Sequence, residues 1–322
     1  MKIVITGGGG FIGFKLAKAL LARGTLAAEK IARLTLVDQA FPADLPKDPR
    51  LATLAGDISD ATFAARAIAA DTTSIFHLAA VVSGAAEADF DLGMRVNLQG
   101  MRNVLEQARS CARPPRLVFA SSVAAFGGDL PEVLDDSTTP APQTSYGSQK
   151  VIGEYLVSDF SRKGYVDGRS LRLPTIVVRP GKPNAAASSF ASAVVREPLN
   201  GIPYDCPLPP ETGVWLLSPR RVVEAFIHAH DLPASAWGPN RVVNLPGITV
   251  TVAAMIEAMA QIAGAQTAKR VAFTPDARIE AIVKTWPVRF ATPRALALGF
   301  KADPGIDAVI RDYISDEGVK IS

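Results

Sequence analysis

The stretch MKIVITGGGGFIG, residues 1–13, decides the fold class. The apolar run from Ile3 to Ile5 has the length and composition of a buried strand, and a glycine-rich turn follows it. Phe11 to Arg23 then shows apolar residues at helical spacing, and Gly24 ends the pattern. A strand, a glycine turn and a helix in this order predict the start of an α/β fold with a parallel sheet covered by helices.

The glycines of this turn stand three residues apart, in GxxGxxG spacing. Gly7 permits a tight turn, Gly10 lets the backbone approach a pyrophosphate, and Gly13 allows close packing of the helix, whose N-terminus then faces the anion. The alternative is a plain flexible turn. We predict a dinucleotide site whose residues in this turn are Gly7, Gly10, Phe11, Ile12 and Gly13.

Two aspartates follow later strands of the same series. Asp38 comes after the second strand, where its carboxylate can accept hydrogen bonds from ribose hydroxyls and would repel a 2′-phosphate. This favours NAD over NADP, with a strand-end turn residue as the alternative. Asp57 and Ile58 follow the third strand and are predicted to meet the adenine, although an aspartate there can equally cap a helix or a turn.

Short apolar runs alternate with longer helical patterns through the first half of the chain, which predicts repeated β-α-β units with right-handed crossovers. The further strands are expected at Leu34 to Val37, Ala52 to Leu54, Ile75 to Leu78 and Leu117 to Ala120, and helices at Ala61 to Ala70 and Leu92 to Cys111. After about Arg179 the chain is rich in Pro, Gly and Ser, as loops are. Helical patterns return at Arg220 to His230, Val252 to Ile262 and Ile306 to Ile314.

Composition excludes several classes of protein. Of the 322 residues 48% are apolar, which excludes disorder, and the net charge of +3 is not gathered into a block, so neither a nucleic-acid nor a membrane partner is indicated. Cys111 and Cys206 match neither a disulfide framework nor a zinc pattern, and His228 and His230 cannot share one helix face, so no metal site is expected. A short apolar start and the absence of a long apolar run favour a cytoplasmic location.

A phenol and an ammonium group stand one helical turn apart in Tyr146-Gly-Ser-Gln-Lys150. The pKa of a free tyrosine is about 10, and a nearby cation favours the phenolate, so this pair predicts a base that works near neutral pH. Ser122 follows the strand Leu117 to Ala120, where the carboxyl ends of parallel strands line a ligand crevice. The alternatives are an ordinary surface pair and a serine that caps the strand.

Five motifs occur in one order: TGGGGFIG, HLAA at 77–80, Asn97 in VNLQG, the serine in SSVAAFG, and YGSQK. Together they resemble the extended branch of the short-chain dehydrogenase/reductase superfamily. The resemblance implies a Rossmann-type doubly wound parallel sheet that binds NAD at residues 1–178, and a smaller C-terminal α/β substrate lobe at 179–322, interleaved with the first. It also implies a homodimer.

The same resemblance implies four catalytic residues. Tyr146 would exchange the proton, and Ser122 would steady the substrate oxygen. Lys150 would bind the nicotinamide ribose and lower the pKa of the tyrosine, while Asn97 would hold a water molecule in a proton relay.

The substrate region departs from the nucleotide-sugar members of the superfamily. Those members tend to have RxxN after the YxxxK helix and a tyrosine after the serine, whereas this chain has Thr175 at the end of RLPT and Phe126. Residues 172–190 resemble instead a subgroup that oxidises the C2 hydroxyl of a four-carbon sugar acid such as D-erythronate. Two alternatives stay open: a nucleotide-sugar epimerase or dehydratase that retains NAD, and a dinucleotide-binding protein that has lost its chemistry.

An acidic substrate needs a cation for its carboxylate. Thr175, Arg179 and Ser188 are predicted to contact the substrate, with a structural ion pair as the alternative for Arg179. Further polar candidates in this region are Lys182, Asn184, Ser189, Arg220 and Arg221. For the two arginines at the start of the predicted helix, an anionic partner and solvated side chains are equally open.

Overall fold

The computed structural model describes residues 1–181 and 188–321, which form two compact units. Unit 1 comprises Met1–Ala125, Pro142–Arg172 and Val223–Asn244, and unit 2 comprises Phe126–Ala141, Leu173–Val222 and Leu245–Ser322. The expected boundary between residues 178 and 179 differs from this division, because one early segment joins unit 2 and one late segment returns to unit 1. Lys182 and Asn184 lie outside the described residues.

A seven-stranded sheet forms the centre of unit 1, and the strand order is β12-β8-β7-β6-β1-β4-β5. Its strands are β1 (Lys2–Thr6), β4 (Arg33–Asp38), β5 (Leu51–Ala55), β6 (Ser74–His77), β7 (Arg116–Ser122), β8 (Asp167–Leu173) and β12 (Val242–Asn244). The pairings run parallel, for example Ile3 with Leu34 and Ile75 with Leu117. The predicted α/β fold with a parallel sheet is confirmed.

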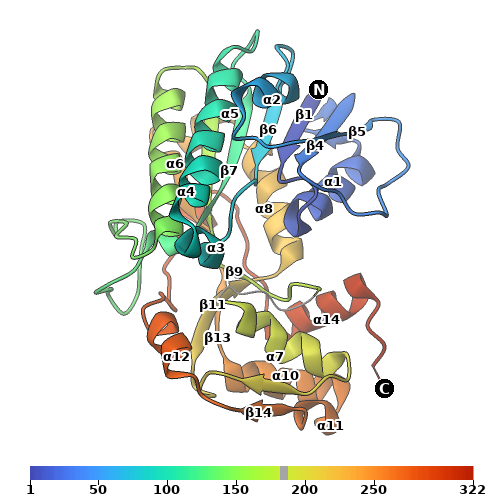
Figure 1. The fold of residues 1–322 in the computed structure, drawn as a ribbon, viewed down its shortest axis with the longest axis vertical. Coiled ribbons are helices and arrows are strands. Elements are labelled where there is room, and N and C mark those ends of the chain that lie inside the picture. The colour runs from blue at the N-terminus through green and yellow to red at the C-terminus, as the bar shows by residue number, and fades with distance from the viewer. Residues whose placement is uncertain (182–187, 322) are drawn as a thin grey trace. The chain divides into compact units, whose positions relative to one another are not determined.

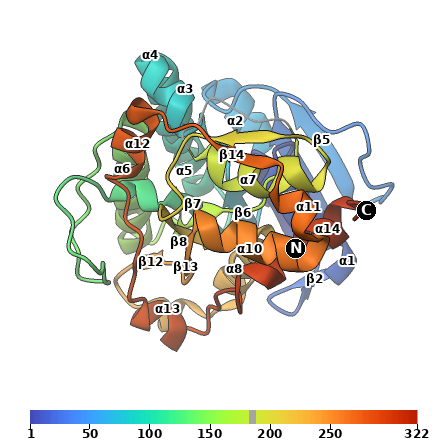
Figure 2. The same ribbon diagram turned by 90° about the horizontal axis from the view of Figure 1, so that it is seen from below.

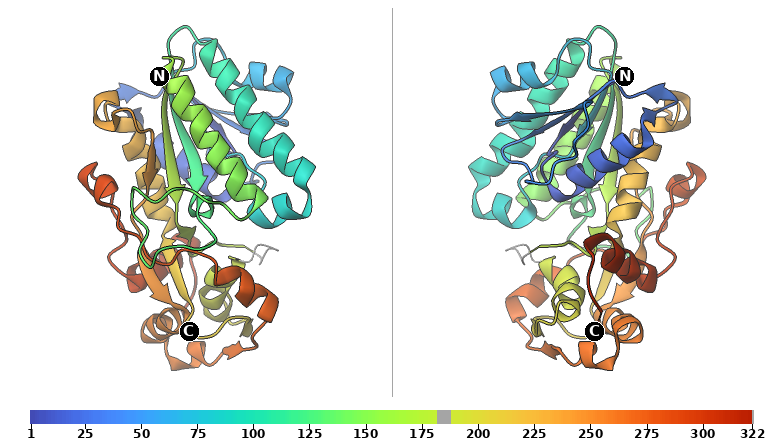
Figure 3. Two further views of the ribbon diagram at one scale, coloured as in Figure 1. Left: turned by 90° about the vertical axis from the view of Figure 1, so that its left-hand side faces the viewer. Right: turned by 90° about the vertical axis from the view of Figure 1, so that its right-hand side faces the viewer.

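Helices cover both faces of this sheet (Figures 1 and 3). They are α1 (Phe11–Arg23), α2 (Ala61–Ala67), α3 (Ser83–Ala88), α4 (Phe90–Gly93), α5 (Gly100–Arg109), α6 (Ser145–Arg162) and α8 (Pro219–Asp231). On the face covered by α2, α5 and α6, the core packs side chains such as Phe63, Met101 and Val157 against Ile75 and Phe119. The other face is covered by α1 and α8 (Figure 3).

The predicted helix Leu92 to Cys111 is three segments. After α4 the chain forms the π-helical turn η1 (Met94–Gln99) and then continues as α5. A π-helical turn is a common feature of functional sites, because it changes the direction of side chains within a helix. The predicted stretch is helical as far as Arg109, but apolar spacing does not reveal where the hydrogen bonding widens.

Unit 2 contains a three-stranded sheet, a two-stranded sheet and several helices. The strands are β9 (Thr175–Ile176), β10 (Tyr204–Cys206), β11 (Gly213–Leu217), β13 (Ile248–Thr251) and β14 (Val271–Phe273). The helices are α7 (Ser189–Leu199), α10 (Val252–Ala263), α11 (Ala265–Ala268), α12 (Ala277–Val283), α13 (Pro293–Ala297) and α14 (Ile306–Glu317). Figure 2 shows α10 beside α7, α11 and α14. Shorter elements of unit 1 complete the fold: β2 (Thr25–Leu26), β3 (Glu29–Lys30), the 3₁₀ turn η2 (Val123–Ala125) and α9 (Ala234–Trp237).

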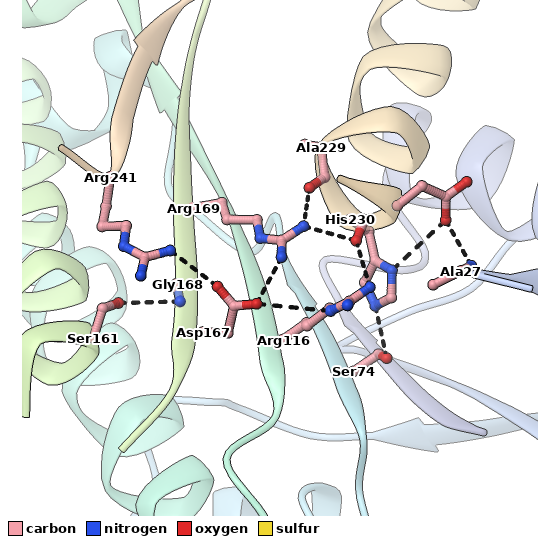
Figure 4. A network of polar contacts seen from close by, with 11 residues as sticks. Ala27, Ser74, Arg116, Ser161, Asp167, Gly168, Arg169, Ala229, His230 and Arg241 are labelled. Atoms are coloured by element: carbon pink, nitrogen blue, oxygen red, sulfur yellow. Dashed lines mark hydrogen bonds and ion pairs between the residues drawn. The ribbon is translucent and has the colours of Figure 1, made fainter. Parts of the chain in front are cut away.

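A polar network lies where the strands of the unit 1 sheet begin, at their amino-terminal ends (Figure 4). The Asp167 carboxylate, at the start of β8, accepts hydrogen bonds from Arg169 at 2.6 Å and Arg241 at 3.0 Å, and Arg116 of β7 is 3.7 Å away. Arg169 also donates to the carbonyl of His230 at 2.7 Å, at the end of α8. The buried guanidinium of Arg169, paired in this way, fixes the end of α8 against the sheet at the edge opposite the glycine turn.

At the start of α8, Arg220 has intramolecular partners that neither of its two alternatives named. Ser218 caps the helix, since its hydroxyl accepts a hydrogen bond from the backbone N–H of Arg221 at 3.2 Å. Arg220 forms ion pairs with Asp312, at 2.6 Å, and with Asp316 of α14. An intramolecular role therefore accounts for this arginine. In the described part of the chain, no helix combines the length and the apolar character that crossing a membrane requires.

Candidate active site

The glycine turn between β1 and α1 has the shape of a phosphate cradle. Gly7 has φ +71°, and its N–H donates to the carbonyl of Val37 at 2.8 Å. A Cβ on Gly13 would lie 2.2 Å from the carbonyl oxygen of Gly7, and one on Gly9 would lie 2.0 Å from that of Ala40. Only glycine fits these positions, so the backbone amides at the start of α1 stay open to an anion. The residues present therefore fit the pyrophosphate of a dinucleotide.

Asp38 ends β4 beside this turn. Its carboxylate accepts hydrogen bonds from the N–H of Gly9 at 3.0 Å and from the N–H of Gln39 at 2.7 Å. Each oxygen of a carboxylate can accept more than one hydrogen bond, so capacity remains for ribose hydroxyls. Phe11 and Ile12, in the first turn of α1, are partly buried.

Asp57 forms a turn of its own after β5. Its carboxylate accepts from both the N–H of Ser59, at 2.8 Å, and the hydroxyl of Ser59, at 2.7 Å. The cap of α2 is Asp60 rather than Asp57. Ile58 is buried in the core between the sheet and the helices. These contacts agree with the turn interpretation of Asp57, and its contact with adenine stays a prediction.

Tyr146 and Lys150 lie on α6, which packs against the carboxyl end of β7 (Figure 1). The Lys150 ammonium nitrogen is 5.4 Å from the centre of the Tyr146 ring and 4.8 Å from that of Phe119. It donates a hydrogen bond to the carbonyl of Ala120 at 2.7 Å. The lysine is buried, so this carbonyl and the two rings stabilise its charge in place of water.

The structure corrects the expected pKa of the tyrosine. Burial raises the pKa of Tyr146 to about 12, although the hydrogen bond with Ser122 opposes the rise. Burial also lowers the pKa of Lys150 to about 7, against the attraction of the Glu154 carboxylate. The sequence predicted a phenol with a lowered pKa, and the direction is the opposite. Loss of solvation penalises both charged forms and outweighs their attraction.

Ser122 ends β7, and its hydroxyl accepts a hydrogen bond from the N–H of Ala124 at 3.1 Å. The strand-end capping interpretation is therefore part of its role. The Ser122 side chain also interacts with the phenol of Tyr146 and opposes the rise in its pKa, so the strand end and the helix face meet at one point. A substrate oxygen held there would contact a donor and a proton acceptor together.

Asn97 lies buried in η1. Its side chain accepts from the N–H of Val81 at 2.7 Å and donates to the carbonyl of Val81 at 3.0 Å and to Gln149 of α6 at 2.7 Å. This asparagine therefore ties the loop after β6 to the helix that carries Tyr146. Its role toward a water molecule stays a prediction.

Of the predicted substrate residues, Thr175, Arg179 and Ser188 lie in unit 2. Thr175 begins β9 and is partly buried, and Ser188 precedes α7 without capping it through its side chain. Arg179 is exposed, and its N–H donates to the hydroxyl of Ser192 at 3.0 Å. Among the described residues no ion pair forms with the Arg179 guanidinium, so the structural ion pair that was its alternative is not found there.

Two residues of α6 belong to this site although the sequence analysis did not select them. Gln149 holds Asn97, and Glu154 lies one turn beyond Lys150. The spacing of Glu154 from Lys150 is a signal that the sequence contains, since residues four apart share a helix face. Its burial and its partners depend on tertiary contacts.

A family model described as the NAD dependent epimerase/dehydratase family matches residues 3–236. The chain belongs to this family. As a member of the NAD dependent epimerase/dehydratase family it is an NAD-dependent oxidoreductase with NAD as its cofactor. The predicted superfamily membership and the predicted cofactor are thereby confirmed.

Several known proteins are similar over nearly the whole chain. A D-erythronate dehydrogenase from Cupriavidus necator is 55% identical over 323 residues, covering 99% of each chain. A D-erythronate dehydrogenase from Haemophilus influenzae is 46% identical over 314 residues, covering 98% of this chain and 99% of the relative. A crystal structure described as a nucleoside-diphosphate-sugar epimerase from Agrobacterium tumefaciens is 39% identical with a TM-score of 0.95, covering 100% of this chain and 96% of that one.

Proposed function

We propose that this protein oxidises the C2 hydroxyl of D-erythronate to the 2-oxo acid, with NAD as the hydride acceptor and Tyr146 as the general base. The observation that carries the proposal is the identity of 55% and 46% to two D-erythronate dehydrogenases over nearly the full chain. The contacts among Tyr146, Lys150 and Ser122 supply a chemical basis, because they combine a proton acceptor, a cation and a hydroxyl donor.

In the proposed mechanism, bound NAD supplies the carbon that accepts the hydride from C2. The Tyr146 phenolate removes the proton of the C2 hydroxyl as the C2–H bond breaks and the C2–O bond becomes a carbonyl. Ser122 donates a hydrogen bond to this oxygen and holds it beside the phenolate. The Lys150 ammonium stabilises the phenolate and offsets part of the desolvation that raises the pKa of the phenol.

We assign the substrate carboxylate to Arg179, with Thr175 and Ser188 as donors to the hydroxyls. Arg179 is an exposed residue, while its backbone is held by Ser192 and by Arg196, which donates to its carbonyl at 2.8 Å. Arg179→Ala is expected to raise the KM for the acid at least tenfold and to leave the KM for NAD unchanged. Arg278→Ala, which removes an exposed arginine of α12, is the matched control.

The experiment that tests the proposed function is an NADH absorbance assay over four- and five-carbon sugar acids and nucleotide sugars. Formation of NADH with D-erythronate supports the proposal, and no signal with any acid contradicts it. The similar solved structure described as a nucleoside-diphosphate-sugar epimerase makes a second candidate worth testing in the same panel. That candidate predicts product from a nucleotide sugar, tightly retained NAD and no NADH accumulation.

We also propose a homodimer that forms through the helix faces of α5 and α6. Ile152 and Tyr155 of α6 are 40% and 67% exposed, and so large an apolar exposure on neighbouring turns is typical of an interface. Light scattering is expected to give twice the mass of one chain. Ile152→Glu should shift the mass toward one chain, and Ile282→Glu, at an exposed position of α12, should not.

A further inference from the structure

The Glu154 carboxylate is buried at the carboxyl end of the sheet and accepts hydrogen bonds from two strands. Arg172 of β8 donates to both of its oxygens, from Nε at 2.8 Å and from Nη2 at 2.7 Å. The Ser121 hydroxyl of β7 also donates to it, and Asn244 of β12 accepts from Arg172 at 3.3 Å. So many directional hydrogen bonds hold the buried ion pair of Glu154 and Arg172 in a single geometry. The pair therefore fixes α6 against the sheet.

The same face of α6 carries Lys150 and Tyr146 at successive turns before Glu154. Lys150 bonds to the carbonyl of Ala120, and Glu154 to the hydroxyl of Ser121. Neighbouring residues of β7 thus hold neighbouring turns of the helix. If Glu154 shifted along the helix axis, the Lys150 ammonium would move away from the Ala120 carbonyl.

The titratable and charged groups around Lys150 come from three elements. They are Tyr146 and Glu154 of α6, His77 of β6, and Arg172 of β8, which is paired with Glu154. His77 stacks on Phe119 with a ring distance of 5.7 Å, and the charge of Lys150 contributes to lowering the pKa of this histidine. Glu154 supplies the negative charge in this set.

We propose that Glu154, held by Arg172, is a positioning residue for the reaction, which keeps Lys150 charged and seated at the Ala120 carbonyl beside Tyr146. This inference rests on the proposed role of Tyr146 as the base, but not on the identity of the substrate. When the Glu154 carboxylate is removed, its attraction no longer opposes the burial that disfavours the charged form of Lys150. Lys150 then loses its proton at a lower pH, and less of it is charged beside Tyr146 near neutral pH.

The test measures the ionisation of Lys150 directly, from the carbon-13 NMR shift of its ε-carbon, assigned by its loss in Lys150→Arg, with saturating NAD. In Glu154→Gln the pKa of Lys150 is expected to fall by about one pH unit, and the alkaline limit of kcat to fall with it. An unchanged pKa of Lys150 in Glu154→Gln overturns the proposal. Asp159→Asn, which breaks an exposed pair with Arg162 on the same helix, is the control and should change neither value.

A second variant separates the loss of the carboxylate from the exposure of an unpaired Arg172. Glu154→Met combined with Arg172→Met removes both charges, and a buried pair replaced by apolar groups keeps the fold stable. The lowered pKa of Lys150 persists in this variant if the Glu154 carboxylate acts on the ammonium. Return to the wild-type value overturns the proposal, because the unpaired guanidinium then caused the shift. The titration needs no sugar acid. If D-erythronate is not a substrate, the titration can therefore still support or contradict the role of Glu154.

Discussion

Tyr146 carries the proposed proton transfer, and its surroundings make the neutral phenol the stable form. Burial raises its pKa to about 12, and burial lowers the pKa of Lys150 to about 7. A buried phenol acts as a base near neutral pH only when a nearby cation stabilises its phenolate. The chain supplies one such cation in Lys150, whose nitrogen lies 5.4 Å from the centre of the Tyr146 ring.

Tyr146→Phe removes the proton acceptor and keeps the ring. Turnover is expected to fall by about 10³-fold or more, because a positioned acid or base contributes about 10² to 10⁴. The affinity for NAD should stay within about threefold, since the ring packing is retained. Steady-state kinetics and quenching of protein fluorescence by NAD measure the two quantities. Unchanged turnover would remove Tyr146 from the mechanism.

Asp38→Ser tests the choice of cofactor. The carboxylate of Asp38 would repel a 2′-phosphate, so its removal is expected to raise the ratio of kcat/KM for NADP to that for NAD by about tenfold or more. The serine hydroxyl can still accept the hydrogen bond from Gly9. Asp57→Asn is the comparison, and a ratio that rises equally in both variants would contradict the role of Asp38.

At the scale of elements, α6 approaches β7 and the η2 turn after it closely, because one glycine of the helix faces each of them. A Cβ on Gly147 would lie 2.1 Å from the carbonyl oxygen of Ala124, and one on Gly153 would lie 2.9 Å from the ring of Phe119. The short side chains of Ser121 and Ser122 therefore reach the helix. Helix and strand were both predictable from their patterns, but the distance between them was not.

Gly147→Ala is expected to push α6 away from η2 and to misplace Tyr146. Overpacking of this kind costs about 1 to 3 kcal/mol of folding free energy, and turnover should fall by more than stability alone explains. Urea unfolding and kinetics on the folded fraction measure the two effects. Gly153→Ala meets a ring instead of backbone, so it should lower stability with a smaller loss of turnover. Equal losses of turnover would argue against the close approach at Gly147.

At the scale of the whole molecule, two histidines, His77 and His230, are buried. His77 accepts or donates a hydrogen bond with Thr6 at 2.7 Å, and burial lowers its pKa from 6.5 to about 3. His230 of α8 bonds to Ser74 at 2.9 Å, and burial lowers its pKa as well. Both histidines belong to unit 1 and are neutral in the folded protein at neutral pH.

Acid should therefore destabilise unit 1. The unfolded chain binds a proton at His77 as the pH falls through 6.5, whereas the folded protein does not bind it until about pH 3. Stability is lost over this window, by about 1.4 kcal/mol per pH unit for this residue. Urea midpoints from about pH 7 to about pH 5 measure the slope. His77→Gln is expected to reduce that slope, and an unchanged slope would contradict the assignment.

The division into units was only partly accessible from sequence. The change of composition near Arg179 is real, but Phe126–Ala141 joins unit 2 through contacts such as the backbone bond between Leu134 and Arg289 at 3.0 Å. Val223–Asn244 returns to unit 1, where Phe226 packs against Phe76 with a ring distance of 6.4 Å. Contacts so distant along the chain leave no local pattern.

Local chemistry let the sequence alone determine the β-α-β order, the glycine turn and the spacing of Tyr146 and Lys150. Each of these follows from propensity, periodicity or the absence of a side chain within a few residues. The tertiary structure alone decided the protonation of the site, the π-helical turn at Asn97 and the partners of Glu154. These depend on burial and on groups from separate strands, and solvation is a property of the folded chain rather than of any segment.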